Sequence, residues 1–315
     1  MSKCYAVTGA NGHLGRHLVA LLLQRGHRVR TLARQPLAGQ DHRIVHVEDV
    51  DGLCCALDGV DGVFHTAAPT QMTASNPEIE IRRPIVDGTR NIINAAVQVG
   101  VPKIVYTSTA ATVGLRQAIP LDESYFNTTS RHPQFRAKLE VEQQLAPMAE
   151  SKGVRFLSVC PPSVLGPSLG RLTPSLKPYA QLVNGELPFL PPMRFHLLDV
   201  RDEAEAQLAL METDVVQHSR YILAGHYVDL RQVVQQIRQH FPILRLPRWT
   251  APKAVFYLLA PFVPELNLTL VRECIGCDQR LDGSRVEREF ALHWRPWQHT
   301  VLDTIEDLLL ARTLR

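Results

Sequence analysis

The feature that most constrains the fold is a glycine-rich turn near the start of the chain. The apolar run Cys4–Thr8 is followed by Gly-Ala-Asn-Gly-His-Leu-Gly at positions 9–15, after which leucines recur at helical spacing. In a strand–turn–helix unit such glycines allow a tight turn, close approach of the backbone to a pyrophosphate, and packing of the helix on the sheet. The first amide groups of the helix favour negative charge. We therefore predict a dinucleotide-binding turn with contacts from Gly9, Asn11, Gly12, His13, Leu14 and Gly15.

Short apolar segments alternate with helical patterns over the first half of the chain. Repeated β-α-β order with short apolar strands is typical of a parallel sheet covered by helices on both faces. Right-handed crossovers then favour an α/β fold with a doubly wound parallel sheet of the Rossmann type. The further predicted strands are Arg28–Ala33, Ile44–Val47, Gly62–His65, Lys103–Thr107 and Val154–Cys160. Long helical patterns cover about 78–99 and about 134–150.

The composition of the sequence changes after Cys160, where prolines become frequent and predicted strands sparse. We predict a dinucleotide-binding domain over 1–165, with return segments near 195–230, and a smaller C-terminal substrate lobe over 166–315. Ligands of open α/β sheets bind outside the carboxyl ends of the strands, so substrate would lie between the two parts. The apolar stretch 251–271 is interrupted by prolines and charges, which argues against a membrane span. We expect it to cover a pocket for a hydrophobic substrate.

Composition excludes several classes of partner. Lys and Arg number 34 against 31 Asp and Glu, a formal net charge of +3, which is too balanced for a protein that neutralises many phosphates. Six scattered cysteines indicate a reducing compartment, and the chain opens on an apolar strand rather than on a signal peptide. The Cys-x-x-Cys pair at 274 and 277 lacks a second pair, so no metal site is expected. We expect a cytoplasmic protein that binds a small-molecule substrate, and neither nucleic acid nor a membrane.

The second predicted strand bears on the choice of cofactor. An acidic residue about 20 positions past the glycines would bind the ribose hydroxyls of NAD, whereas an arginine accommodates the phosphate of NADP. No Asp or Glu occurs before Asp41, and Arg34 follows the strand directly. Arg16 and Arg34 are the candidate phosphate partners, although both could instead be solvated surface residues. The sequence favours NADP(H), with NAD(H) as the alternative.

Seven segments together resemble the extended short-chain dehydrogenase/reductase family, also called the NAD-dependent epimerase/dehydratase family. The resemblance is to its dihydroflavonol-reductase-like and 3β-hydroxysteroid-dehydrogenase-like branch, and it runs over nearly the whole chain. It implies that Thr66, Ala67 and Ala68 lie alongside the pyrophosphate and ribose of the cofactor. Similar proteins pair as homodimers through the helices at 78–99 and 134–150, although those faces could simply cover the sheet. The segments are Thr8–Gly15, Val63–Ala68, Asp87–Asn91, Val105–Thr109, Pro161–Pro167, Leu281–Val286 and Trp294–Pro296.

The resemblance also implies contacts at the two ends of the cofactor. Asp49, after the third predicted strand, would accept a hydrogen bond from the adenine amino group, with Val50 beside it. Pro161 and Val164 belong to the proline-glycine loop beside the nicotinamide. Cys160 stands where members that act on nucleotide sugars commonly carry arginine, so a less polar carbonyl compound is favoured as substrate.

The family's chemistry uses a Ser or Thr, a Tyr and a Lys, with the last two four residues apart on one helix face. Thr109 matches the hydroxyl position and Lys138 the lysine, which would also hold the nicotinamide ribose. Gln134 stands in place of the tyrosine. Because a carboxamide has no proton to transfer near neutral pH, Gln134 can only form hydrogen bonds.

Three interpretations follow from Gln134. The chain could be an NADP(H)-dependent oxidoreductase of a small, fairly apolar carbonyl compound, with another group as proton donor. His132 and Tyr125 lie just upstream as candidates, and Tyr125 could instead anchor a loop. Alternatively, the fold could perform a chemistry without that proton transfer, or be a catalytically silent cofactor-binding sensor. We favour the oxidoreductase.

Overall fold

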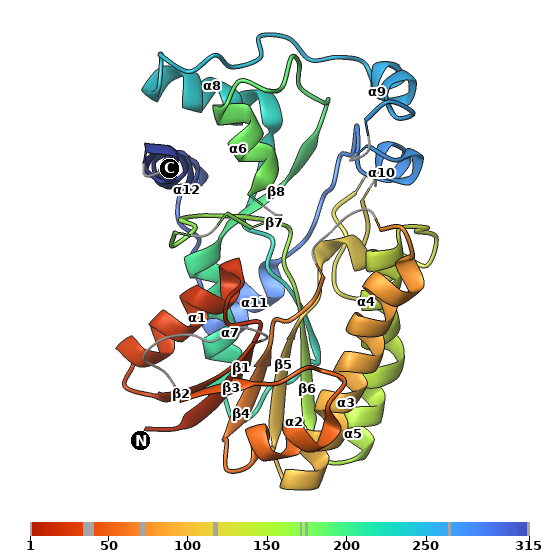
Figure 1. Cartoon of the computed structure of the whole chain (residues 1–315), viewed down its shortest axis with the longest axis vertical. Coiled ribbons are helices and arrows are strands. Elements are labelled where there is room, and N and C mark those ends of the chain that lie inside the picture. Colours follow the sequence, from red (N-terminus) through yellow and green to blue (C-terminus); the bar gives the residue numbers. More distant parts are fainter. Residues whose placement is uncertain are drawn as a thin grey trace.

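A seven-stranded sheet forms the centre of the computed structural model, which describes residues 2–33, 41–69, 74–115, 119–170, 172–173, 176–263 and 266–313. Its order is β3-β2-β1-β4-β5-β6-β9, and every neighbouring pair runs parallel. This confirms the predicted doubly wound α/β sheet (Figure 1). The strands are β1 (Cys4–Thr8), β2 (Arg28–Ala33), β3 (Asp41–Ile44), β4 (Gly62–His65), β5 (Lys103–Thr107), β6 (Arg155–Cys160) and β9 (Arg220–Ile222).

The third strand begins earlier than the sequence predicted. The prediction was Ile44–Val47, whereas β3 spans Asp41–Ile44. Asp41 is opposite Arg30 of β2 in the ladder, and their side chains form an ion pair of 2.8 Å. Val45 and Val47 follow the strand and pack against the core from a loop. The prediction was wrong because pairing with β2, and not burial of its own apolar residues, fixes this exposed edge strand.

Helices cover both faces of the main sheet, as Figure 1 shows. One face carries α2 (Val50–Leu57), α3 (Arg83–Val99), α4 (Pro133–Glu140) and α5 (Ala146–Ser151). The other carries α1 (His13–Gln24), α7 (Val200–Glu212) and α11 (Ser284–Phe290). Two π-helical turns, Glu78–Arg82 and Val141–Leu145, extend α3 and join α4 to α5. The predicted long helical segments are therefore confirmed.

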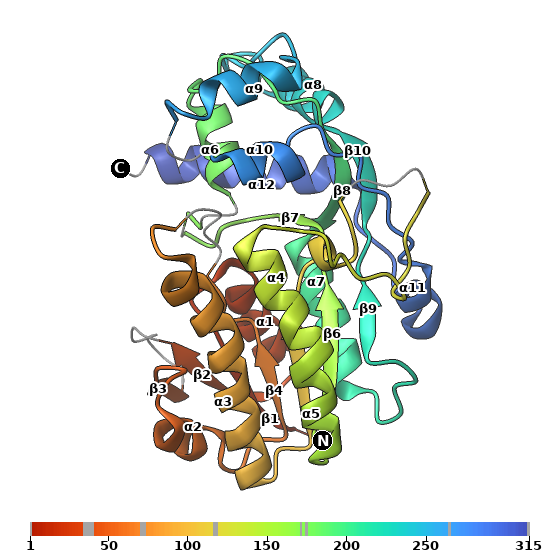
Figure 2. The same ribbon diagram turned by 90° about the vertical axis from the view of Figure 1, so that its right-hand side faces the viewer.

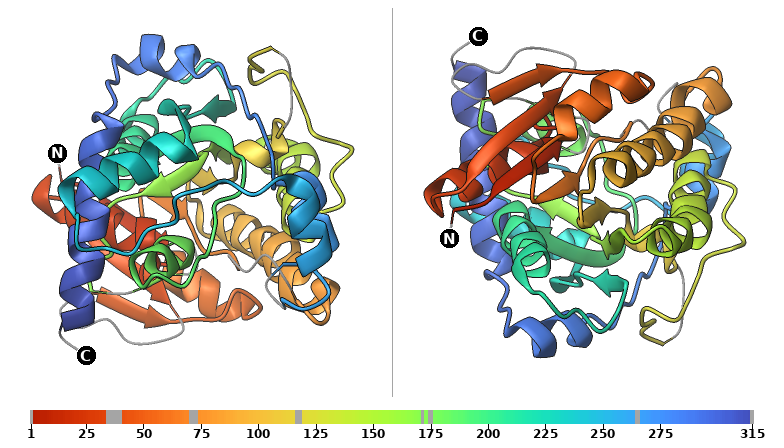
Figure 3. Two further views of the ribbon diagram at one scale, coloured as in Figure 1. Left: turned by 90° about the horizontal axis from the view of Figure 1, so that it is seen from above. Right: turned by 90° about the horizontal axis from the view of Figure 1, so that it is seen from below.

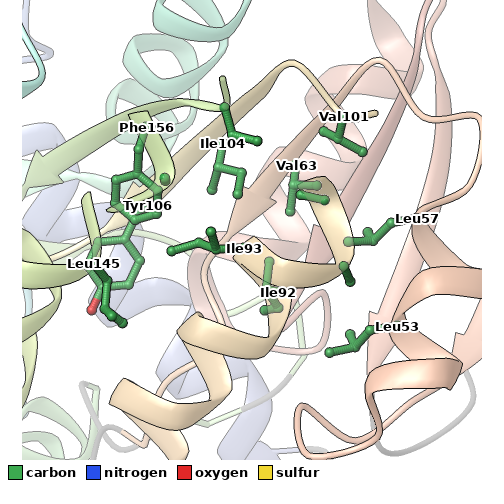
Figure 4. Packing of buried hydrophobic residues seen from close by; sticks show 14 of the residues in the cluster. Leu53, Leu57, Val63, Ile92, Ile93, Val101, Ile104, Tyr106, Leu145 and Phe156 are labelled. Atoms are coloured by element: carbon green, nitrogen blue, oxygen red, sulfur yellow. The ribbon is translucent and has the colours of Figure 1, made fainter. Parts of the chain in front are cut away.

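Central strands are buried along their whole length, as parallel strands covered on both sides must be. Figure 4 shows how Val63 of β4, Ile104 of β5 and Phe156 of β6 face Ile92 of α3. These side chains are fully buried. The sheet is thus a rigid base from which the loops at its carboxyl edge project.

A second, three-stranded sheet lies beyond the carboxyl ends of the main strands (Figure 2). Its order is β10-β8-β7, built from β7 (Ser163–Leu165), β8 (Arg194–Asp199) and β10 (His226–Asp229). Segment 195–230 thus contributes to both sheets, and the predicted boundary at residue 165 stays a prediction. The helices described around this lobe, seen from above in Figure 3, are α6 (Lys177–Val183), α8 (Leu230–His240), α9 (Lys253–Leu259), α10 (Leu268–Glu273) and α12 (Trp297–Thr313).

Candidate functional site

The glycine turn between β1 and α1 is built so that backbone approaches backbone. Gly9 has φ +67°, and a Cβ there would lie 2.9 Å from the backbone of Ala67. A Cβ on Gly12 would lie 3.0 Å from the Gly9 carbonyl oxygen, and one on Gly15 would lie 2.8 Å from the Cα of Ala10. The first turn of α1 carries no acidic side chain. This cradle fits a pyrophosphate, which needs close backbone amides and no competing carboxylate.

Two histidines tie the start of α1 to the loop after β7. The Nε2 atoms of His13 and His17 lie 3.0 and 2.9 Å from the carbonyl oxygen of Pro167. A carbonyl only accepts, so both rings donate to it. Burial lowers the pKa of His13 to about 4 and also lowers that of His17. The start of α1 and the proline-glycine loop, which was predicted to lie beside the nicotinamide, are therefore joined directly.

The candidate phosphate partners differ in what the structure shows. Arg16 donates from Nη1 to the carbonyl of Leu169 at 2.8 Å and from Nε to that of Asn11 at 3.4 Å. Arg34 lies outside the described residues. The choice between NADP(H) and NAD(H) stays a prediction from the sequence.

A buried network fixes the carboxyl end of β4 beside the glycine turn. The Thr89 hydroxyl donates to the carbonyl of Ile85 at 2.5 Å, so it accepts from Nε2 of His65 at 3.0 Å. Nδ1 of His65 then accepts from the Thr8 hydroxyl at 2.8 Å. Burial lowers the pKa of His65 to about 3, so the ring is neutral. His65 is therefore a structural residue that aligns β4 with β1.

The same network positions the segment after β4. Thr66 donates from its hydroxyl to the carbonyl of Thr8 at 2.7 Å, and the amide of Ala67 donates to the Thr8 hydroxyl at 3.2 Å. Ala68 follows and packs on the core. Thr66 and Ala67 thus lie against the glycine turn, and the cofactor contacts of all three residues stay predictions.

The residues predicted near adenine lie at the start of α2, and those predicted near nicotinamide lie just after β6 and in β7. Asp49 caps α2, accepting from the amide of Gly52 at 2.9 Å, and Val50 beside it is exposed. Pro161 accepts from the amide of Ala110 at 2.8 Å. Val164 lies in β7 and is partly buried. Their cofactor contacts stay predictions.

Lys138 reaches the carboxyl end of β5 from α4. Its Nζ donates to the carbonyl oxygens of Thr107 at 3.0 Å and Ser108 at 2.9 Å. Its side chain is buried, and burial lowers its pKa to about 8. Thr109 follows these two carbonyls, with Oγ1 accepting from the amide of Ala111 at 3.3 Å. The structure therefore brings the predicted lysine and hydroxyl residue to one edge of the sheet.

Gln134 lies one turn before Lys138 on α4 and is buried. Its Nε2 donates to the carbonyl of Pro69 at 2.7 Å. The carboxamide thus connects α4 to the segment that follows β4. In this position it forms a hydrogen bond and has no proton to transfer.

The two alternative proton donors occupy different environments. His132 is fully buried, and its ring stacks on Phe135 with centroids 4.3 Å apart. Tyr125 is 45% exposed, and its carbonyl accepts from Arg220 at 2.5 Å. Neither environment tests a role in proton transfer.

Sequence reasoning missed three buried polar residues behind this edge: Glu142, Glu203 and Gln207. Glu142 accepts from Thr112 at 2.7 Å and from Arg220 at 2.6 Å, and Ser108 also donates to it. On α7, Glu203 and Gln207 are buried as well. For Glu203 and Gln207, the only signal in the sequence was their spacing of four residues within an otherwise largely apolar helix face.

Two further expectations concern metals and membranes. Over the described ranges, His, Cys, Asp and Glu side chains form no group of three or more that could hold a metal ion. Within the same part of the chain, helices long and apolar enough to cross a bilayer are absent.

Comparisons with known proteins agree with this geometry. Residues 5–225 match the model of the NAD dependent epimerase/dehydratase family. Cinnamoyl-CoA reductase 2 of Arabidopsis thaliana is 32% identical over 270 residues, covering 78% of this chain and 80% of that protein. Tetraketide alpha-pyrone reductase 1 of the same plant is 29% identical over 271 residues, covering 77% and 82%.

Solved structures show the same fold. That of gox2253 has a TM-score of 0.83 at 25% identity and covers 98% of both chains. Yeast methylglyoxal/isovaleraldehyde reductase Gre2, complexed with NADPH, has a TM-score of 0.79 at 20% identity and covers 98% of this chain and 99% of its own. Bordetella bronchiseptica WbmH, in complex with NAD+, has a TM-score of 0.77 at 19% identity, with coverages of 98% and 99%.

Proposed function

This chain belongs to the NAD dependent epimerase/dehydratase family, and on that premise we propose that it is an NADPH-dependent reductase of a small, fairly apolar carbonyl compound. The broader assignment, an NAD(P)-dependent oxidoreductase, rests on the named reductases among its relatives. The preference for NADP(H) and an active site without tyrosine are the proposed parts. Oxidation of the corresponding alcohol is the same reaction in reverse.

The observation that carries the proposal is the position of Lys138 beside Thr109. Both lie at the carboxyl edge of the sheet, where ligands of such folds bind. Lys138 would hold the nicotinamide ribose, and the hydroxyl of Thr109 would orient the carbonyl oxygen of the substrate. The bound cofactor supplies the hydride in this chemistry. Gln134 would contribute a hydrogen bond, so the proton must come from another group.

Contacts of the C-terminal lobe support an apolar substrate. Glu273, at the end of α10, accepts from the hydroxyl of Ser130 at 2.5 Å and from the amide of Arg131 at 2.7 Å. The end of α10 is thereby held close to the start of α4, which carries Gln134 and Lys138. Relatives named for cinnamoyl-CoA, dihydroflavonol and tetraketide alpha-pyrone reduction support an aromatic or similarly apolar substrate.

A non-redox enzyme or a catalytically silent cofactor-binding sensor is the second candidate. The observation that favours it is Gln134, whose amide is bound to the backbone at Pro69. Loss of an acid costs hydride-transfer enzymes about 10²–10⁴-fold in rate. We also propose a homodimer through α3 and α4–α5, which sedimentation velocity tests.

A stopped-flow experiment tests the reductase. Binding of NADPH and NADH is first measured by calorimetry, and the NADPH complex is then mixed with a panel of aromatic and aliphatic aldehydes and ketones. We expect loss of NADPH absorbance with at least one apolar carbonyl compound. Tight cofactor binding without oxidation across the panel would instead support the silent sensor.

A further inference from the structure

Glu203 is a buried carboxyl group that the proposed reaction does not yet use. It lies on α7, and only 2% of it is exposed. Its Oε1 accepts from Nε2 of Gln207 at 3.3 Å. Burial of an acidic side chain with so little compensation is costly, and such groups concentrate at functional sites. Its position therefore needs an explanation.

Thr107 connects Glu203 to Lys138 through the end of β5. The carbonyl of Thr107 accepts from Lys138 at 3.0 Å, and its hydroxyl accepts from Gln207 at 3.0 Å. Lys138 comes from α4 and Glu203 from α7, which lie on opposite faces of the sheet (Figure 1). The two ionisable groups thus approach the same strand end from both sides.

The charges around Lys138 single out Glu203. Besides Glu203, the charges of Glu142 and Cys160 raise the pKa of Lys138. The Lys138 ammonium in turn lowers the pKa of His65. Glu142 is ion-paired with Arg220 at 2.6 Å. Burial raises the pKa of the Cys160 thiol to about 12, and His65 is neutral. Among the described residues, Glu203 is therefore the acidic neighbour of Lys138 that forms no ion pair with an arginine.

Burial acts on the two groups in opposite directions. It lowers the pKa of Lys138 to about 8 and raises that of Glu203 to about 8. The attraction between the charged forms works against both shifts. Two interacting groups with overlapping ranges titrate as a pair, so a change in one alters the protonation of the other.

We propose that Glu203 is a positioning residue that sets the protonation of Lys138 from the opposite face of the sheet. This deepens the proposed function and rests on it. The negative charge of Glu203 acts across the end of β5 and favours the ammonium form of Lys138. In that form Lys138 would hold the nicotinamide ribose with its positive charge beside the reacting carbonyl.

The titration of Lys138 tests the pairing without any substrate. The intact protein, labelled with ¹³C-lysine, is titrated by NMR, and Lys138→Arg assigns the resonance. We expect Glu203→Gln to move the titration of Lys138 to lower pH by at least half a unit, because the negative charge is lost. Glu205→Gln, a partly exposed carboxyl on the same helix, should leave it unchanged. An equal midpoint in wild type and Glu203→Gln overturns the proposal.

Two further arms keep the outcome clear. If Glu203→Gln does not fold, Glu203→Leu fills the buried position without a polar group and reports the same shift. The pH profile of single-turnover NADPH oxidation should move with the Lys138 midpoint. A shifted midpoint without turnover in any variant contradicts the reductase but supports the electrostatic pairing. Turnover with an unshifted midpoint contradicts the pairing and leaves the reductase.

Discussion

Gln134 donates from its carboxamide to the backbone carbonyl of Pro69 at 2.7 Å. This bond joins the helix that carries Lys138 to the segment that leaves β4. A tyrosine at the same position would place a phenol one helical turn from the lysine, where a cation lowers its pKa. The identity of this side chain therefore separates a hydrogen-bonding role from an acid.

Gln134→Tyr should increase the rate of hydride transfer to an accepted carbonyl compound tenfold or more, because positioned acids contribute about 10²–10⁴-fold. Single-turnover oxidation of NADPH measures it. Gln134→Phe is the matched control, since it adds the ring without the hydroxyl, and it should give no increase. Slower turnover in Gln134→Tyr would show that the carboxamide serves a different mechanism.

Arg34→Ala should weaken NADP⁺ binding by well over tenfold and barely change NAD⁺ binding, because only NADP⁺ carries the 2′-phosphate. Calorimetry with both cofactors measures the two affinities. Arg43→Ala, an exposed arginine on the edge strand β3, is the control and should affect neither. Equal losses for the two cofactors would rule out a phosphate contact at Arg34.

Gly15→Ala should abolish cofactor binding or folding, because the new Cβ would lie 2.8 Å from the Cα of Ala10, within the turn. The comparison is Gly26→Ala, where φ is +79° but nothing lies within 4 Å of the added atom. That variant should lose about 1 kcal/mol of stability and retain its cofactor affinity. Thermal unfolding and calorimetry measure the two effects. Normal NADPH affinity in Gly15→Ala would contradict the cradle.

Stability should fall as pH decreases from 6.5 towards 5. His13, His65 and His196 are buried with pKa values lowered to about 4, 3 and 4, so the unfolded chain binds more protons than the folded one. Each contributes a slope of about 1.4 kcal/mol per pH unit. Glu203, whose pKa is raised to about 8, opposes them with a single proton. Urea unfolding across this range measures the net slope.

His13→Gln should make that slope shallower, because one of the histidines that must be neutral in the folded state is removed. A second substitution in an exposed histidine, His240→Gln, should leave the slope as it is. Stability that stays constant between pH 6.5 and 5 in the unmodified protein would refute the argument.

Arg220→Met should destabilise the fold by about 3–5 kcal/mol, because it leaves Glu142 buried without its partner. Both side chains of this pair are less than one-tenth exposed. Arg25→Met breaks an exposed pair with Glu205 and should cost about 0–1 kcal/mol. Urea unfolding gives both values. Similar losses of stability in the two variants would show that burial does not determine the cost of breaking an ion pair in this protein.

Local sequence signals predicted the parts of the site that depend on spacing. The glycine turn follows from its spacing after an apolar strand, whereas Thr109 and Lys138 were assigned from the resemblance to the family's motifs. Ile44–Val47 failed as a strand because an exposed edge depends on its neighbour β2. Glu203 was missed for a related reason, because its proposed role depends on Lys138. Lys138 is 65 positions earlier in the chain, and only the folded sheet brings the two residues to the same strand end.

The shared carbonyl of Pro167 has a consequence for how fast cofactor arrives. Since His13 and His17 both fasten this loop to α1, the two segments expected to contact the cofactor are held together, and little conformational entropy should be lost on binding. Association should then follow simple second-order kinetics, without a slow rearrangement that saturates as cofactor concentration rises.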